Sequence, residues 1–160
     1  MRLQGNFGQD FQNFGAKLLI ETLIKVEKGT APRYKQGEEF SVTKRITKEM
    51  AIINWNTTTS KELNNLVRGL NPFLGAYSFL KGKKFKLWSI RIENEELFDK
   101  TILEKSEPGK IILSDSKKGL FIKTLDGVIS VIEIQEENSK KMGILDFLRG
   151  NKIEENNKFQ

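Results

Sequence analysis

The spacing of hydrophobic residues changes at Gly75, and this change most constrains the fold. Before Gly75, apolar residues recur at intervals of three and four, which is typical of amphipathic helices. Beyond Gly75 they alternate with polar residues over short runs, which is typical of half-buried strands. The expected strands are residues 76–80, 84–93, 110–114, 120–124 and 128–135. Five short strands predict a small β-barrel, so the fold class is mainly β with helices.

Short helices are predicted on both sides of these strands. Thr59 and Glu62 have the spacing of a capping box, and the apolar stripe that follows predicts a helix over residues 59–70. Thr47 is expected to cap a single turn that ends near residue 50. Residues 144–150 contain enough apolar side chains for a closing helix.

The same patterns divide the chain into four segments. Residues 1–29 hold a long amphipathic helix over residues 7–27, and residues 30–48 form a polar, basic linker. Residues 49–150 form the barrel. Residues 151–160 are charged and poor in apolar side chains, which predicts a flexible tail.

The absence of cysteine and histidine excludes several kinds of site. A disulfide framework and a thiolate zinc site are both impossible, and any metal ion would need oxygen ligands alone. The acidic residues 93–107 lack the spacing of a calcium loop, so we expect no metal. No apolar run is long enough to span a membrane and the first ten residues lack a signal-peptide core, so we expect a cytoplasmic protein with no membrane partner.

The net charge of +6 favours a polyanionic partner. Five cations fall within residues 81–91 with no acid between them. Strand alternation should place Lys84 and Lys86 on one face, and Phe85 and Leu87 on the core side. These lysines could equally solvate a sheet face. Trp55 and Trp88 could stack on bases, but we expect both in the core.

Several short motifs occur in a characteristic order. They are Ile46-Thr47-Lys48-Glu49, Ile53-Asn54-Trp55, Arg68-Gly69-Leu70-Asn71-Pro72, Gly75-Ala76, Pro108-Gly109, Asp126-Gly127, Gln135, Lys140-Lys141-Met142, Asp146-Phe147-Leu148 and Gly150. In this order, over residues 43–150, they resemble the carboxy-terminal domain of the methionyl-tRNA formyltransferase family. Residues 15–31 also resemble the last helix of that family's catalytic domain. Asn54, Leu74 and Ser139 depart from the family's usual aspartate, proline and glycine.

The resemblance implies an open, OB-like Greek-key β-barrel of about five strands, preceded by a helical arm and a linker. It also implies that the chain is the tRNA-binding part of an enzyme that formylates initiator tRNA. The family's catalytic asparagine, histidine and aspartate belong to a preceding domain, which also holds 10-formyltetrahydrofolate. We therefore expect no catalytic residue and no cofactor in this chain. The expected partners are initiator tRNA and a formyltransferase catalytic domain, in cis or in trans.

The residues expected to contact tRNA are the cations that the resemblance and the charge pattern single out. They are Lys44, Arg45, Lys48, Lys81, Lys83, Lys84, Lys86, Lys140 and Lys141. Two alternatives remain open. The chain could be the tail of a related formyltransferase that acts on a folate or a sugar nucleotide. It could also be a stand-alone interaction module that docks through the apolar face of its first helix.

Overall fold

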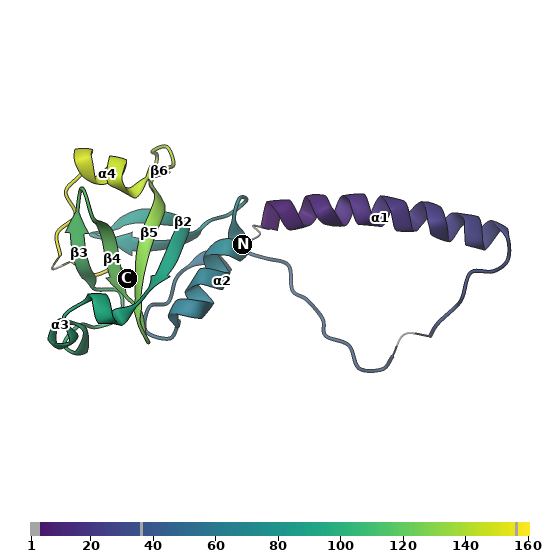
Figure 1. The fold of residues 1–160 in the computed structure, drawn as a ribbon, viewed down its shortest axis with the longest axis horizontal. Coiled ribbons are helices and arrows are strands. Elements are labelled where there is room, and N and C mark those ends of the chain that lie inside the picture. The colour runs from purple at the N-terminus through teal and green to yellow at the C-terminus, as the bar shows by residue number, and fades with distance from the viewer. Residues whose placement is uncertain (1–3, 36, 156) are drawn as a thin grey trace.

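The computed structural model describes residues 4–35, 37–155 and 157–160, and it consists of a compact barrel joined by a linker to a long helix (Figure 1). Helix α1 (Gln4–Glu27) comes first, followed by the single 3₁₀ turn η1 (Glu49–Ala51) and helix α2 (Ser60–Leu70). Residues 30–35 and 37–48 adopt neither helix nor strand. The expected long helix and second helix are therefore present in this order.

The barrel is built from a six-stranded antiparallel sheet in the described part of the chain. The strands are β1 (Ala76–Leu80), β2 (Lys83–Glu93), β3 (Ile111–Asp115), β4 (Gly119–Lys123), β5 (Val128–Glu136) and β6 (Met142–Gly143). Their spatial order is β1-β2-β5-β4-β3, and β6 pairs with β5. The five predicted strands are confirmed. The fold is mainly β with helices, in the form of a small, open, OB-like barrel.

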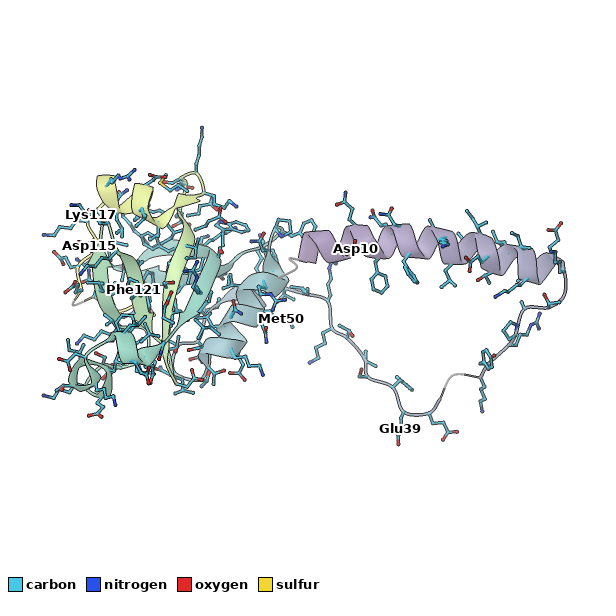
Figure 2. All side chains as sticks on the ribbon, in the orientation of Figure 1. Asp10, Glu39, Met50, Asp115, Lys117 and Phe121 are labelled. Atoms are coloured by element: carbon cyan, nitrogen blue, oxygen red, sulfur yellow. The ribbon has the colours of Figure 1, made fainter. Side chains whose placement is uncertain are left out.

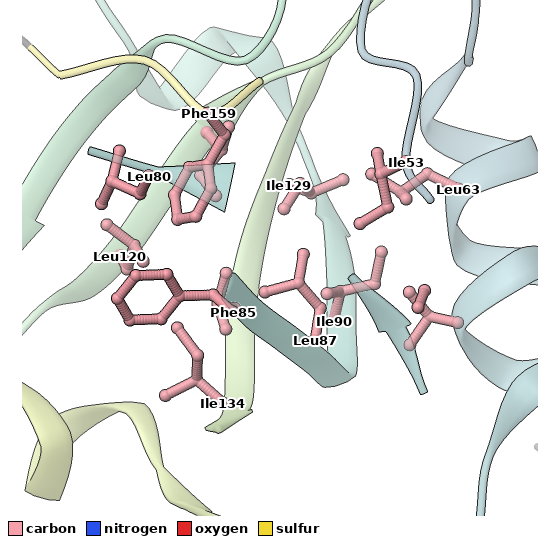
Figure 3. Packing of buried hydrophobic residues seen from close by; sticks show 14 of the residues in the cluster. Ile53, Leu63, Leu80, Phe85, Leu87, Ile90, Leu120, Ile129, Ile134 and Phe159 are labelled. Atoms are coloured by element: carbon pink, nitrogen blue, oxygen red, sulfur yellow. The ribbon is translucent and has the colours of Figure 1, made fainter. Parts of the chain in front are cut away.

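Short helices fill the connections between the strands. The acidic segment between β2 and β3 forms the turn η2 (Glu95–Leu97) and helix α3 (Lys100–Glu104), which the sequence did not predict. Helix α4 (Ile144–Gly150) follows β6 and confirms the expected closing helix. The hydrophobic core lies between the curved sheet and the helices that cover it (Figure 3).

Helix α2 packs its apolar stripe into this core. Leu63, Val67 and Leu70 are buried, in the stripe that the sequence predicts. The capping box is confirmed, because the Thr59 hydroxyl accepts from the backbone N–H of Glu62, and the Glu62 carboxylate accepts from the backbone N–H of Thr59. The helix start is therefore closed by the two reciprocal bonds that give this motif its stability.

The predicted cap at Thr47 is wrong. The turn η1 begins at Glu49, and Lys48 occupies its N-cap position without a side-chain hydrogen bond to a described residue. The Thr47 hydroxyl instead bonds to the Glu49 side chain and lowers the pKa of that carboxyl. Beyond this turn, Trp55 is buried as expected. Ile53 is buried too, whereas Ile52 is exposed and bridges to Tyr77 of β1.

The predicted flexible tail is also wrong for residues 151–155 and 157–160. Ile153 and Phe159 are buried in the core, and the Phe159 ring lies edge-on to Phe85, with 6.0 Å between the ring centroids. Phe79 and Gln160 exchange two backbone hydrogen bonds of 3.0 and 2.8 Å. The segment is tied to β1 although it carries only two large buried apolar side chains, which is too few for a periodic pattern.

The final residues also reach the strand at the opposite edge of the sheet. The Phe159 N–H donates to the Gly109 carbonyl, and Lys110 forms a β-bridge with Lys158. Gly109 has a φ of +88°, and a Cβ there would lie 2.5 Å from the Phe159 carbonyl oxygen. We call residues 157–160 the closing segment, because they connect the edge of β1 with the residues that lead into β3.

Helix α1 stands largely apart from the barrel, and only its first part lies near α2 (Figure 1). Its apolar side chains point into solvent along its length (Figure 2). They include Phe11, Phe14, Leu18, Leu19, Leu23 and Ile24, and each is at least 45% exposed. Among the described residues, no helix has the length and apolar character needed to cross a membrane.

Candidate nucleic-acid interface

The outer face of β1 and β2 carries lysines and aromatic rings. Phe85 and Leu87 point into the core, so Lys84 and Lys86 lie on the other side of the same strand. The predicted alternation is confirmed. In the register of the two strands, Lys86 is opposite Tyr77, and Lys84 is opposite Phe79. Directly opposed residues of antiparallel strands share a face, so these four side chains form one surface.

Trp88 extends this surface, and its predicted place in the core is wrong. The side chain is only partly buried, and its indole N–H donates to Oε1 of Gln135 over 2.9 Å. Leu87 occupies the core position, and the next residue of a strand points to the opposite face. The register shift around Ser89 then turns Ile90 inward and leaves Trp88 outside. Trp55, in contrast, is buried as predicted and donates to the Ser78 hydroxyl.

Two lysines converge on the Trp88 ring. The ammonium nitrogens of Lys86 and Lys141 lie 5.3 and 5.8 Å from the ring centroid, within the range of cation–π attraction. Lys84 lies at 5.7 Å from the Tyr77 ring in the same manner. We call this surface the aromatic–lysine face. It consists of Tyr77, Phe79, Lys84, Lys86, Trp88 and Lys141.

The remaining expected contact residues lie elsewhere. Lys81 and Lys83 flank the tight turn between β1 and β2, and Lys140 is exposed beside Lys141 before β6. Lys44, Arg45 and Lys48 are exposed in the linker and its junction with η1. The structure therefore brings Lys84, Lys86 and Lys141 together on the aromatic–lysine face. It leaves the three linker cations on a separate segment.

Most cations near this face are paired with carboxylates. Lys81 contacts Glu154 at 3.0 Å, Lys83 contacts Glu136 at 2.7 Å, Lys84 contacts Glu137 at 3.2 Å and Lys141 contacts Glu133 at 3.1 Å. The ammonium group of Lys81 lowers the pKa of Glu154, so that carboxyl stays ionised. Pairs at a solvated surface contribute about 0 to 1 kcal/mol, so an incoming phosphate can replace the carboxylate at little cost.

Lys86 differs from these residues, because no carboxylate of a described residue forms an ion pair with it. Its ammonium group instead lies over the Trp88 ring, 5.3 Å from the ring centroid. Lys86 therefore breaks no ion pair when it contacts a phosphate, and this contact costs less free energy than it does for the paired lysines of the face.

Tyr77 and Phe79 belong to this surface although the sequence did not single them out. The inward positions of β1 are held by Ala76, Ser78 and Leu80. Ser78 is inward because its hydroxyl accepts from the Trp55 indole and donates to the Gln160 carbonyl. A prediction of the register between β1 and β2 would have placed the two rings opposite Lys84 and Lys86.

A separate hollow of about 410 Å³ lies between the sheet and α4. Its lining mixes the cations Arg91, Lys118 and Arg149 with the acids Glu93 and Asp146. Glu93 accepts a 2.5 Å hydrogen bond from the Ser130 hydroxyl, and Asp146 is paired with Arg149. Charges of both signs are therefore mixed here as well, but in the described part of the chain none of these cations lies over an aromatic ring.

Comparisons with known proteins agree with this architecture. Residues 45–152 match the family described as "Formyl transferase, C-terminal domain". A methionyl-tRNA formyltransferase of Ruminiclostridium cellulolyticum is 36% identical over 151 residues, which cover 94% of this chain and 46% of that protein. One of Agathobacter rectalis is 38% identical over 146 residues, covering 91% of this chain and 44% of that protein. The chain thus spans a little under half the length of these relatives.

Solved structures share the fold. HypX from Aquifex aeolicus in complex with tetrahydrofolic acid superposes with a TM-score of 0.58 at 23% sequence identity, over 82% of this chain and 22% of that one. At this identity the similarity concerns the fold alone. The family match covers most of the chain, including the linker junction, the whole sheet and α4. On this evidence, the chain belongs to the formyl transferase C-terminal domain family.

Proposed function

We propose that this chain is the tRNA-binding part of a methionyl-tRNA formyltransferase, which formylates initiator methionyl-tRNA in the cytoplasm for translation initiation. The observation that carries the proposal is the family match together with relatives of that name at 36% and 38% identity over more than nine tenths of the chain. The chain's net charge of +6 and its aromatic–lysine face suit a polyanionic substrate.

In this proposal, the binding energy comes from phosphate contacts. Each phosphate that a lysine or arginine neutralises releases condensed counterions, which favours binding without reading the base sequence. Lys84, Lys86, Lys140 and Lys141 would contact RNA at the sheet, with Lys81 and Lys83 at its end. Lys44, Arg45 and Lys48 would contact it from the linker, which can adapt to the RNA because it has no regular structure.

Bond-making is assigned to a catalytic domain that works with this chain in cis or in trans and holds the 10-formyltetrahydrofolate. We assign no catalytic residue to the chain itself. Helix α1 offers the surface for that domain, because Phe14, Leu18 and Ile24 are exposed along it. Burying such side chains would yield roughly 1.5 to 3 kcal/mol each, which is ample for a stable contact.

A salt titration against initiator tRNA tests the proposal. The affinity of the chain should fall steeply with salt, since each phosphate contact adds about 0.7 to 0.9 to the slope of log K against log salt concentration. The double variant K86Q/K141Q should bind more weakly and lose about 1.4 to 1.8 from that slope. The variant K118Q, altered on the β3–β4 turn, is the matched control and should behave as the wild type. Binding that does not respond to salt would disprove the phosphate contacts.

A further inference from the structure

Trp88 is held in a fixed position on the outer face of the sheet. Its indole N–H donates to Oε1 of Gln135 at 2.9 Å, and the amide nitrogen of Gln135 donates to the Ser139 carbonyl at 2.8 Å. The Asn71 amide donates to the Trp88 carbonyl at 2.8 Å. A ring that is already ordered loses little conformational entropy when a second ring stacks on it.

One face of this ring rests on Gly75. A Cβ at position 75 would lie 3.1, 3.1 and 3.2 Å from three adjacent carbons of the six-membered ring. Distances this similar place that point above the ring plane, because an atom beyond the edge would be clearly nearer to the middle carbon. Gly75 also has a φ of +70°, which side chains rarely adopt. The backbone at residue 75 therefore supports the indole from one side.

Further rings continue from Trp88 along the same surface. Tyr77 and Phe79 pack edge to face with 5.8 Å between centroids, and Phe79 remains 37% exposed. Lysines of β2 face these rings across the strand pair, with Lys86 opposite Tyr77 and Lys84 opposite Phe79, and successive pairs are roughly 6.6 Å apart along the strands. A row of rings beside a row of cations can pair with the planar bases and the phosphates of one nucleic-acid strand.

We propose that the aromatic–lysine face is a stacking site for unpaired nucleotides of RNA. A base stacks on the Trp88 ring. The phosphates on either side of that base then replace the ring as the partners of Lys86 and Lys141. The inference rests on the proposed function and deepens it, since phosphate contacts alone require no aromatic surface. Charge decides between occupants, because three lysines among three rings suit a polyanion that also carries π faces better than the apolar surface of a protein partner.

The full 160-residue chain offers a direct probe of this site. It contains two tryptophans, of which Trp55 is only 3% exposed, so a change in tryptophan emission on binding reports Trp88. A single-stranded ten-nucleotide oligouridylate should quench this emission. A duplex RNA of equal length should not, because its bases are already stacked on one another.

Two substitutions separate stacking from charge. Trp88→Leu keeps an apolar side chain but removes the π face, and it should weaken oligouridylate binding about tenfold or more. It should leave the salt slope unchanged, since it removes no cation. Trp88→Phe keeps a ring and should bind within about threefold of the wild type. Lys86→Gln should have the complementary effect and lower the slope by about 0.7.

The outcomes distinguish this inference from the proposed function. If Trp88→Leu binds the oligonucleotide as tightly as the wild type, or if the emission at saturation does not change, the stacking site is disproved while salt-dependent tRNA binding still stands. If the wild type binds no tRNA at all, the proposed function fails first. Should Trp88→Leu fail to fold by circular dichroism, the emission of the wild-type chain and the affinity of Trp88→Phe decide the matter.

Discussion

Phe159 shows how a single side chain near the end of the sequence can hold the fold together. Its ring is fully buried and packs against both Trp55 and Phe85, with ring centroids 5.9 and 6.0 Å away. Phe159 is therefore part of the hydrophobic core, although it lies far along the chain from most of the other core residues. Its neighbours along the chain are polar, so the sequence pattern did not reveal this role.

Phe159→Ala should lower the free energy of unfolding by about 3 to 5 kcal/mol, because it leaves a cavity that the surrounding rings cannot fill. Urea unfolding followed by circular dichroism measures this loss. Phe73→Ala serves as control, since Phe73 is 75% exposed and its removal should change stability by less than about 0.5 kcal/mol. Equal losses for the two variants would contradict the burial of Phe159.

Asp126 links the turn before β5 to the start of α2. The backbone N–H of Ser60 donates to its carboxylate at 2.7 Å, and this hydrogen bond lowers the pKa of Asp126. A carboxyl whose pKa is lower in the folded state stabilises the fold above its unfolded pKa of about 3.9. That stability is lost as the pH falls through the lower, folded pKa.

The acid sensitivity of the fold should therefore decrease in Asp126→Asn. Between about pH 5 and pH 2, the free energy of unfolding should fall less steeply in this variant than in the wild type, because the carboxyl that must take up a proton is gone. Urea unfolding at a series of pH values measures the difference. Glu104→Gln, altered at an exposed side chain of α3, should keep the wild-type slope. An unchanged slope in Asp126→Asn would show that this hydrogen bond has no energetic role.

At the scale of elements, the alternation of side chains was sufficient to locate β1 to β5. It failed where an element has too few residues for a period to develop, as in β6 (two residues), η2 (three) and α3 (five). Alternation also gave the correct face for Lys84 and Lys86. It could not show which neighbours those lysines have, because cross-strand register and the bulge at Ser89 depend on tertiary pairing.

The start of α2 is the best-determined local element, and its cap can be tested alone. Thr59→Ala removes the hydroxyl that accepts from Glu62 and should cost about 1 kcal/mol of stability. Thr57→Ala is the matched control, since Thr57 is exposed and lies outside the helix. The difference between the two in thermal or urea unfolding gives the contribution of the cap. A cost for Thr57→Ala as large as that for Thr59→Ala would argue against it.

At the scale of the whole molecule, the sequence correctly predicted a long first helix and a later set of strands. It placed the end of the barrel too early, at residue 150, because Ile153 and Phe159 stand alone among polar residues. These two side chains are buried because the closing segment pairs with the edge of β1 and with the residues that lead into β3. This tertiary pairing cannot be predicted from a local sequence pattern. The same limit applies to the candidate site, where distant residues such as Gly75, Trp88 and Lys141 meet only after the sheet has formed.

Limited trypsin digestion should reveal these boundaries. Cleavage is expected first at Arg33, Lys35, Lys44 and Arg45, which are exposed in a segment without regular hydrogen bonds. Mass spectrometry should find a resistant fragment that begins near residue 46 and still contains Phe159. Early cleavage at Lys152 would contradict the docked closing segment, because that bond precedes the buried Ile153.

The closing segment also imposes an order of events during synthesis. Gly109 and Phe159 are joined by a backbone hydrogen bond, as are Phe79 and Gln160, so contacts that complete the sheet span 50 and 81 positions of the chain. When synthesis has reached only residue 150 of this chain, the two edges of the sheet lack the partners that the closing segment supplies, and such edges invite pairing with other chains. The nascent barrel therefore stays exposed to misassembly until its last few residues have left the exit tunnel.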